Sequence, residues 1–355
     1  MKFLTITIAI FLQVIWGITN VNGQDGHFTQ FYNIPAYANP ALVGTSHTSY
    51  RVSTIYRDQW FSALNEPLTS FAFSGDLKFD MGGDSKYPDF VGVGIMFFND
   101  KVNALDFTTN QISVSGSYTK LLDKSSEQYL GIGLQTSIQT KSIGYGKLFF
   151  GDQFNSIDGF TNPTREDLTS NNLGFFDLSL GLNYSGELIP NHKINLGLSA
   201  FHILSPNISF YNSDPILEDR YDSRSLLPTR WSLHGNYKYT VNKNMSSETR
   251  FYINRQNPFS EVNISHLLGF YNPKFPERYF FAGPGIRATK VKDIGMGIES
   301  FNVTAGVNYN KVVVSASFDQ PINPVIRNRR NFSSFEISFI LFGDYDNQVD
   351  ICPKF

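Results

Sequence analysis

Apolar and polar residues alternate with a period of two along most of this chain, and no other feature constrains its fold as strongly. Between Phe176 and Tyr184 every even position is apolar, and every odd position is polar or glycine. The same alternation recurs over Leu130–Ile138 and Phe301–Tyr309. Side chains of a β-strand point alternately to opposite faces, so each stretch predicts a strand with one apolar and one polar face.

Fourteen segments show this pattern, and an even number of strands of about 9–16 residues is typical of a bacterial outer-membrane barrel. Pro284 falls inside the eleventh segment, where it predicts a bulge or break because proline cannot donate to the ladder. The segments are 49–60, 68–79, 89–101, 109–122, 128–143, 175–187, 193–204, 230–241, 245–256, 260–272, 278–289, 299–309, 311–319 and 332–342.

Connections between the expected strands alternate between long and short, with 144–174 and 205–229 the longest. Short turns on one side and long loops on the other are typical of such barrels, with the long loops outside the cell. A sheet in lipid cannot leave its edges unpaired, so the first strand should pair with the last. The following aromatic residues near strand ends suit the interfacial girdle: Tyr118, Tyr184, Trp231, Tyr237, Tyr239 and Tyr309.

The composition favours a membrane barrel over the alternative, a secreted β-sandwich. A sandwich would have shorter strands and a more charged surface, whereas charged residues make up only 17% of this chain. A formal charge of −2 offers no electrostatic case for binding nucleic acid. The single cysteine excludes an intrachain disulfide framework and a cysteine-cluster metal site.

The first 23 residues predict a secretory signal, with Lys2 followed by an apolar stretch from Phe3 to Trp16. The alternative is an uncleaved anchor, but the stretch is shorter than the ~20 residues of a membrane-spanning helix. We therefore expect a signal peptide at 1–23, an N-terminal segment at 24–48, an outer-membrane β-barrel at 49–342 and a C-terminal tail at 343–355. The fold class is all-β, a transmembrane antiparallel barrel of about 14 strands.

The N-terminal segment is a candidate periplasmic or plug-like element. It lacks the strand pattern but is rich in aromatic residues and prolines, such as Phe28, Tyr37 and Pro40, which would not be left in water. Glycine, serine, asparagine and threonine dominate the inward face of the strands, which leaves a wet lumen or room for such a segment. Packing of these rings under the barrel rim is the alternative.

The residues give little sign of chemistry. None of the six histidines forms an HExxH motif or a close metal pair, and Gly92-Val-Gly94 or Gly131-Ile-Gly133 are better explained as inward-facing glycines than as nucleotide loops. Ser232 and His234 share one face of a strand, which leaves a barrel hydrolase as a minor alternative. We therefore expect no catalytic, cofactor-binding or metal-binding residues and no enzyme activity.

Two further groups have open interpretations. The acidic residues Asp344, Asp346 and Asp350, and the loop residues Asp152 and Asp158, have calcium-type oxygens but fit no EF-hand spacing, so solvated carboxylates are favoured. The role of Cys352 is left open: it is a lone thiol, for which an intermolecular or reactive thiol and a buried unreactive one are both compatible.

After the signal, the chain resembles the opening of the PorP/SprF family, type IX secretion and gliding-motility outer-membrane proteins of Bacteroidetes. Members begin with Gln-Asp, then Phe-Ser-Gln-Tyr, then Asn-Pro-Ala and glycine; here Thr29 replaces the serine and Phe31 precedes Tyr32. The family's Tyr-Arg-x-Gln-Trp is similar to Tyr56-Arg57-Asp58-Gln59-Trp60, and the chain closes with Cys352-Pro353-Lys354-Phe355, also as in family members. The matching opening reads Gln24-Asp25, Phe28-Thr29-Gln30-Phe31-Tyr32, Asn39-Pro40-Ala41 and Gly44.

The resemblance implies a non-enzymatic role with type IX secretion or gliding components as partners. Some members accompany periplasmic ring and motor components, and others deliver or hold the C-terminal domain of a large surface adhesin. A channel or transporter for small or hydrophobic solutes, also with fourteen strands and an N-terminal plug, is the alternative function. Candidate partner or plug-segment residues are Gln30, Tyr32, Pro35, Tyr37, Asn39, Pro40, Gly44, Arg51, Arg57, Gln59 and Trp60.

Arg51 and Arg57 should point to the same inner face, because they are six positions apart and side chains alternate with a period of two. They could pair with carboxylates of the N-terminal segment or of a partner. The alternative is that they only balance lumen acids such as Asp76.

Overall fold

The computed structural model describes residues 25–61, 64, 66–81, 87–213, 225–291, 295–322 and 333–345. The predicted signal peptide and most of the predicted tail, including Asp346, Asp350 and Cys352, lie outside the described residues. Short helices come first, followed by long strands. The elements are η1 (Phe31–Asn33), α2 (Pro35–Ala38), η2 (Pro40–Leu42), β1 (Tyr50–Gln59), β2 (Leu68–Met81), β3 (Asp89–Val102), η3 (Asn103–Leu105), β4 (Phe107–Asp123), β5 (Gln128–Ile143), η4 (Tyr145–Lys147), η5 (Gly151–Gln153), β6 (Phe154–Asn155), β7 (Gly159–Phe160), β8 (Asn172–Ile189), β9 (His192–Phe201), η6 (Phe210–Ser213), β10 (Arg230–Asn242), β11 (Met245–Gln256), β12 (Phe259–Asn272), β13 (Phe275–Val291), β14 (Gly295–Tyr309), β15 (Val312–Pro321) and β16 (Ser334–Gly343).

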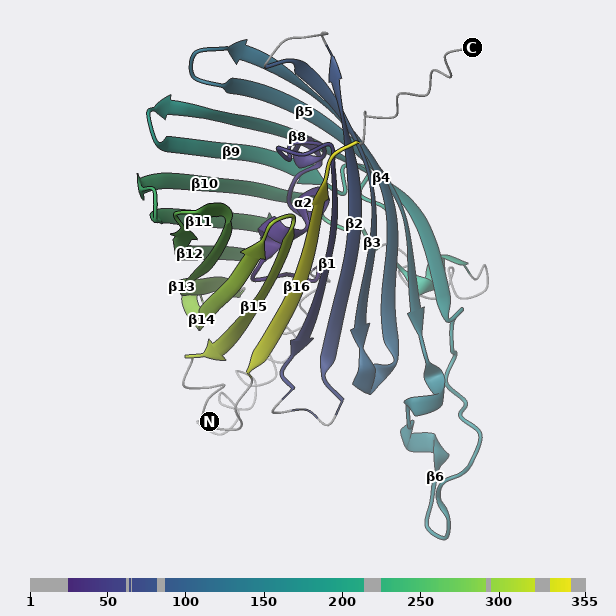
Figure 1. The fold of residues 1–355 in the computed structure, drawn as a ribbon. Helices are drawn as coiled ribbons and strands as arrows, with labels where there is room; N and C mark the ends of the chain where they lie inside the picture. Colours follow the sequence, from purple (N-terminus) through teal and green to yellow (C-terminus); the bar gives the residue numbers. More distant parts are fainter. Residues whose placement is uncertain are drawn as a thin grey trace, which may run out of the picture.

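Fourteen of these strands form one closed antiparallel barrel (Figure 1). Each strand pairs with its neighbours in the chain, and closure comes from β1 and β16, which pair from Tyr50↔Gly343 to Gln59↔Ser334. Closure pairs the edges of β1 and β16 with each other, which a sheet surrounded by lipid requires. The predicted fold class and strand number are confirmed.

The alternation places apolar side chains outside and small polar ones inside. On β5, Ile132, Leu134 and Ile138 are exposed, whereas Gln135 and Ser137 are buried. The outward residues of the other strands follow the same rule, and the exposed face matches the apolar band of a membrane barrel. No helix in the described part of the chain is long and apolar enough to cross a membrane.

The two ends of the barrel differ in their connections. At one end, called here the short-turn end, lie Tyr50, Gly343 and the turns 190–191, 243–244, 273–274 and 310–311. At the other, the long-loop end, lie the connections 144–171 and 202–229. The first of these contains η4, η5 and the two-stranded sheet β6–β7, and it projects beyond the barrel (Figure 1).

Strand β13 runs through Pro284 but loses part of its ladder there. Its pairing with β12 stops at Ser265↔Gly285 and resumes at Leu268↔Ala282 in the same register. On the other side Pro284 still pairs with Val303 of β14. The expected disturbance is therefore a local break without a bulge, because a proline nitrogen has no hydrogen to donate.

Candidate functional site: the N-terminal segment in the barrel lumen

Residues 25–48, called here the lumen segment, cross the inside of the barrel (Figure 1). The segment starts near the long-loop end, where the Asp25 N–H donates to Gln256 Oε1 at 3.1 Å. It reaches the short-turn end at Gly44, whose N–H donates to Asp76 Oδ1 at 3.0 Å. The chain then turns into β1, so the segment is continuous with the barrel wall.

Prolines and one capping residue set the local structure of the segment. Pro35 begins α2 and Pro40 begins η2, and proline suits the first position of a helix because its fixed φ is already helical. Asn39 caps η2, because its Oδ1 accepts the Ala41 N–H at 2.8 Å. The result is a string of single turns compact enough to fit within the lumen.

An apolar core joins the segment to the first three strands. Phe28, Ile34 and Tyr37 of the segment are buried together with Ile55, Ala72, Met96 and Phe98 of β1–β3. Phe28 meets Tyr37 and Phe98 edge to face, with ring centroids 5.5 and 6.0 Å away. These apolar side chains face inward in an otherwise polar lumen, and the segment removes them from water.

Inward-facing glycines let the segment backbone approach the wall. A Cβ atom on Gly133 of β5 would lie 2.3 Å from the Ala41 nitrogen, and one on Gly92 of β3 would lie 2.2 Å from the Val43 oxygen. Both distances are shorter than any real contact of a Cβ atom. The pairs Gly92/Gly94 of β3 and Gly131/Gly133 of β5 therefore form a seat for residues 40–43, on the inner face that the alternation predicts.

Asn39 fixes the segment to the opposite wall. Its Nδ2 donates to the Leu182 carbonyl at 2.8 Å and lies 3.1 Å from His234 Nε2. One amide thus caps a turn with its oxygen and bonds β8 with its nitrogen. Asn39 is completely buried, so loss of either bond would leave a buried polar group without its partner.

A buried ionic cluster lies where the barrel closes, formed by Arg57, Glu261, Arg287, Asp319 and Glu336. Arg57 pairs with Glu336 and, at 3.1 Å, with Asp319. Arg287 pairs with Asp319 at 3.0 Å and with Glu261 at 3.2 Å. All five side chains are almost fully buried, so each charge depends on the others.

The lumen segment supplies hydrogen bonds to this cluster. The backbone N–H groups of Thr29 and Gln30 donate to the two carboxylate oxygens of Glu336, at 2.6 and 2.9 Å. The Thr29 hydroxyl donates to Asp319 at 2.7 Å and accepts from Arg57. The segment therefore completes the charge network at the seam between β1 and the last strands.

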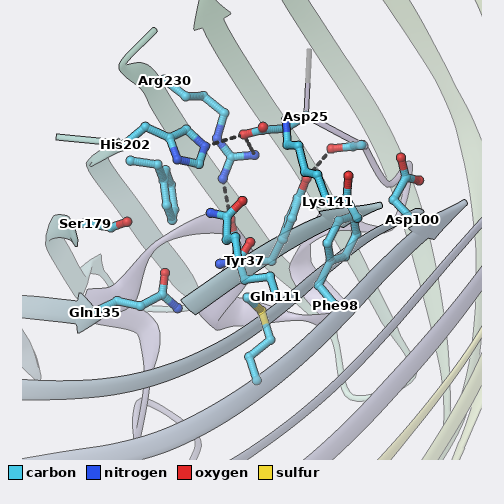
Figure 2. A pocket seen from close by; sticks show the side chains of 15 residues that line it. Asp25, Tyr37, Phe98, Asp100, Gln111, Gln135, Lys141, Ser179, His202 and Arg230 are labelled. Atoms are coloured by element: carbon cyan, nitrogen blue, oxygen red, sulfur yellow. Dashed lines mark hydrogen bonds and ion pairs between the residues drawn. The ribbon is translucent and has the colours of Figure 1, made fainter. Parts of the chain in front are cut away.

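A second charged group, called here the N-terminal latch, holds the start of the segment and consists of Asp25, Asp177, His202 and Arg230. His202 lies between two carboxylates, with its Nε2 2.7 Å from Asp25 Oδ2 and its Nδ1 on Asp177. Arg230 Nη1 lies 3.4 Å from the same Asp25 oxygen, and its Nη2 donates to the Tyr37 carbonyl (Figure 2). The latch joins the segment to β8, β10 and the connection after β9.

The latch holds its charges over a wide pH range. Burial alone would lower the pKa of His202, but the carboxylates of Asp25 and Asp177 outweigh it and raise the pKa from 6.5 to about 9. Burial alone would raise the pKa of Asp25, but His202 and Arg230 hold it well below its usual 3.8. At neutral pH His202 is therefore protonated and Asp25 is ionised.

The structure brings most of the predicted site residues together. Gln30 and Asn33 bond Ser315 and Ser338, and the Tyr32 ring lies 3.6 Å from the Arg250 guanidinium. Gln59 and Trp60 stand apart at the long-loop end of β1, where the Trp60 N–H donates to Ser334. The predicted residues that lie in or against the segment are Gln30, Tyr32, Pro35, Tyr37, Asn39, Pro40, Gly44, Arg51 and Arg57.

The two predicted arginines form ion pairs with acidic residues on the inner face of the barrel, as the alternative interpretation of Arg51 and Arg57 predicts. Arg51 Nε lies 2.8 Å from Asp76, and Arg57 pairs with Asp319 and Glu336. Each also touches the segment through neutral oxygens: Arg51 donates to the Leu42 carbonyl and Arg57 to the Thr29 hydroxyl.

Sequence reasoning missed the latch and most of the ionic cluster. The available signal was a charged or histidine side chain on the small, polar face of a lipid-facing strand, as at Arg230, Arg287 and Glu336. Charges within membrane-spanning strands are expected inside the barrel and near a partner. Alternation alone could not show which of them pair, because the partners lie on different strands.

The candidates that lie among the described residues do not come together as a catalytic or metal site. Ser232 Oγ bonds the Tyr252 hydroxyl, while His234 faces Asn39. Asp152 accepts from Thr164 and from the Arg165 N–H. Among the described residues, no three His, Cys, Asp or Glu side chains form a group that could hold a metal ion.

Comparison with known proteins gives one family match. The model of the family described as "Type IX secretion system membrane protein PorP/SprF" matches residues 20–341. A search of curated proteins finds no match.

Three solved structures are similar to this chain at low identity. The CymD monoaromatic hydrocarbon channel is 10% identical, with a TM-score of 0.49, over 93% of this chain and 97% of its own. A Pseudomonas aeruginosa FadL homologue is 10% identical, with a TM-score of 0.48, over 87% and 94%. The Pseudomonas putida toluene transporter TodX is 9% identical, with a TM-score of 0.47, over 91% and 98%. At this level of similarity they carry no inference about function.

Proposed function

The chain belongs to the PorP/SprF family of type IX secretion system membrane proteins, and on that premise we propose that it docks a partner protein without catalysing a reaction. The partner is a type IX or gliding component, or the C-terminal domain of a large surface adhesin that is delivered to or anchored at the cell surface. The barrel is an outer-membrane protein, so such a partner reaches it from the periplasm or from outside. The lumen segment is the part that we assign to coupling the barrel to its partner.

One observation carries this proposal: the segment is bonded to the wall along its whole path. The N-terminal latch holds Asp25, the ionic cluster holds Thr29, and Asn39 and Gly44 bond β8 and β2. A lumen crossed by such a segment favours a rigid platform over an open pore. Rigidity suits docking because a preorganised surface loses little entropy on binding.

The loop asymmetry supports an orientation. Barrels of the bacterial outer membrane have short periplasmic turns and longer extracellular loops. We therefore place the short-turn end in the periplasm and the connection 144–171 outside the cell.

The projecting connection offers a surface for a partner outside the cell. Phe149, Phe154 and Phe160 cluster with ring centroids 5.3–5.4 Å apart and are largely exposed. Ile157, at the tip between β6 and β7, is 90% exposed. Exposed apolar clusters of this kind mark protein interaction sites.

Deletion of residues 24–47 tests the role of the segment. The barrel should still insert, because its ladder is closed by β1 and β16, but partner association should be lost. Co-purification of type IX components and surface display of the adhesin are the measurements. Normal display by the deletion strain would show that the segment has no part in docking.

Substitutions in the projecting connection 144–171 test whether the partner docks there or on the lumen segment. Phe154→Ser with Ile157→Ser alters only exposed side chains and leaves the lumen unchanged. Loss of display in this variant, with a normal lumen, would place docking outside the cell. The location of the gene beside a large adhesin gene or beside motor-component genes would separate adhesin handling from the machinery core.

The alternative is an outer-membrane channel or transporter for small or hydrophobic solutes. A cavity of about 520 Å³ at the short-turn end, lined by Lys78, Glu127 and Lys193 among others, favours some access from that side. A steady conductance of the purified protein would support this alternative.

A further inference from the structure

A groove of about 530 Å³ lies on the barrel wall where β12, β13 and β14 reach the short-turn end. It opens on the outer surface, because Phe280, Val307 and Tyr309 of its lining are each more than half exposed. The buried residues of the same strands, such as Arg287 and Asn302, alternate with them and face inward. We call this recess in the lipid-facing surface the outer groove; its lining includes Phe270, Asn272, Arg278, Phe280, Val307 and Tyr309.

Arg278 is held in one orientation within the outer groove. Its guanidinium carbon lies 4.5 Å from the centroid of the Phe275 ring and 4.6 Å from that of Tyr309. Its Nε donates to Asn310 Oδ1 at 3.1 Å and lies 3.9 Å from Glu277, which is beyond hydrogen-bond distance. Nη1 and Nη2 donate to no residue that the structure describes, and 37% of the side chain is exposed. The outer edge of this guanidinium is therefore free to bind an anion.

Basic side chains surround the outer groove at the end of the barrel. Three short turns, which precede β11, β13 and β15, join strands that are neighbours in the barrel, and each turn carries one exposed lysine. These lysines are Lys243, Lys274 and Lys311. The turn that borders the groove contains Lys274, whose ammonium has no hydrogen bond or ion pair with a described residue.

The acidic residues described beside these turns do not cancel the positive charge. They are Glu277 and Asp344, and Asp344 already pairs with Lys311 at 3.2 Å. With Arg278 and the three lysines, four cations face two carboxylates at this rim. The net charge around the groove is therefore positive.

Charges inside the barrel do not change this balance. Arg250 and Glu248 pair with each other on the inner face. Glu261, the member of the buried ionic cluster on β12, lies eleven positions from Asn272, which is roughly 36 Å at ~3.3 Å per residue. Screening acts over about 8 Å at physiological ionic strength, so the cluster does not determine the field at the groove.

We propose that the outer groove binds an anionic phospholipid of the leaflet at the short-turn end. The phosphate bonds the free edge of Arg278, with the Lys274 ammonium beside it, and an acyl chain lies along Phe280 and Val307. Hydrogen bonds between a guanidinium and a phosphate are among the strong ones, and aromatic rings at the level of the headgroups keep the arginine there. A lipid is favoured over a free phosphate because the groove continues into the apolar band that contacts acyl chains.

Native mass spectrometry of the purified full-length protein in an uncharged detergent tests this site. Dioleoyl phosphatidylglycerol should bind at least about fivefold more tightly than dioleoyl phosphatidylcholine, because its headgroup carries one more net negative charge. Dioleoylglycerol, which lacks the phosphate, should not bind. Equal binding of the two phospholipids, or binding of dioleoylglycerol as tight as either, would refute the proposal.

Two arginine variants show whether Arg278 binds the phosphate. Arg278→Gln should weaken the binding of phosphatidylglycerol about tenfold, because the charge-assisted bonds are lost. Arg255→Gln is the matched control, since Arg255 is also exposed but lies near the long-loop end of β11, and it should bind the lipid as the unchanged protein does. Equal weakening by the two variants would show general attraction by charge and would refute the site.

A filling variant tests the acyl-chain part of the groove without changing any charge. Val307→Trp should fill the groove and abolish binding, whereas Val303→Trp, on the same strand and the same face but outside the groove, should not. Unchanged binding by Val307→Trp would show that the lipid binds elsewhere and would refute the proposal.

A soluble phosphate distinguishes a lipid site from a site for free phosphate compounds. Glycerol 3-phosphate at about 10 mM should not displace phosphatidylglycerol, because it lacks the acyl chains that pack in the groove. Displacement at that concentration would identify a free phosphate compound as the ligand and would contradict the lipid assignment. None of these measurements involves the lumen segment or partner docking, so failure here would leave the proposed function intact.

Discussion

The backbone N–H of Thr29 donates a 2.6 Å hydrogen bond to the carboxylate of Glu336, which lies 307 residues away in the last strand. Glu336 pairs across the barrel seam with Arg57 of β1, so the lumen segment is fixed at the place where the barrel closes. The order of the segment and the closure of the barrel are therefore physically linked.

Replacing Glu336 by alanine should release the segment. The change removes the acceptor of two backbone N–H groups and leaves Arg57 with Asp319 alone. Breaking a buried ion pair from one side costs about 3–5 kcal/mol, because the other charge remains buried. In a Cys352→Ser background with Ala36→Cys, whose site is 1% exposed, maleimide labelling should become at least about tenfold faster.

A double variant controls for the ion pair itself. Arg57→Met with Glu336→Leu removes both charges. This double change should destabilise the lumen segment less than the sum of the two single changes does. Additive effects on labelling would show that Arg57 and Glu336 do not act as a pair.

Gly133→Ala should displace the Pro40–Leu42 turn. The new methyl group would lie 2.3 Å from the Ala41 nitrogen, so either the segment or β5 must move. Crowding of a packed interior costs about 1–3 kcal/mol, and labelling of the cysteine at position 36 should rise accordingly. Gly116→Ala is the control, because nothing lies within 4 Å of its added atom; equal labelling of the two variants would contradict the glycine seat.

Two substitutions of Asn39 separate its two roles. Asn39→Asp keeps the oxygen that caps η2 but replaces the donor to the Leu182 carbonyl with a second oxygen. A carboxylate facing a buried carbonyl is more unfavourable than a missing bond, so aspartate should destabilise the segment more than alanine does. Hydrogen exchange of the Ala41 and Leu42 amides measures this; the reverse order would mean that capping dominates.

The latch should weaken at high pH. The raised pKa of His202 means that its contribution is complete below its ordinary pKa of 6.5 and is lost as pH rises through about 9. The lowered pKa of Asp25 means that its contribution is present above 3.8 and is lost in strong acid. Thermal unfolding in detergent should therefore occur at a lower temperature at pH 10.5 than at pH 7.5.

The variant His202→Gln provides the matched control for this pH dependence. Glutamine cannot carry the imidazolium charge, so the variant should be less stable than the unchanged protein at pH 7.5. The difference between the two should shrink above about pH 9. A difference that persists unchanged at pH 10.5 would show that the charge of His202 does not hold the latch.

The strands of the barrel could be predicted from the sequence because alternation and proline effects depend on residues that are neighbours in the chain. Alternation over β5 yields the observed bounds at Gln128 and Ile143, and Pro284 marks the observed break in the ladder. The small sheet β6–β7 was not predicted, since two residues per strand are too few for a pattern. Strand β9 ends at Phe201 rather than 204, where His202 adopts a positive φ of 58°.

The contents of the lumen were harder to predict because they depend on contacts distant in sequence. The aromatic residues of the segment indicated burial, and the inward Met96 and Phe98 break the polar inner face, which is a usable sign of a filled lumen. The pairing of Asp25 with His202 spans 177 residues and leaves no spacing rule to read. Only the register of the closed barrel brings these side chains together.

Conductance of the purified protein in a planar bilayer tests the central claim most directly, namely that the lumen segment occupies a closed barrel. The unchanged protein should show no steady conductance, and deletion of residues 24–47 should open a large, stable pore. A steady open channel in the unchanged protein, with the same conductance after the deletion, would contradict the account.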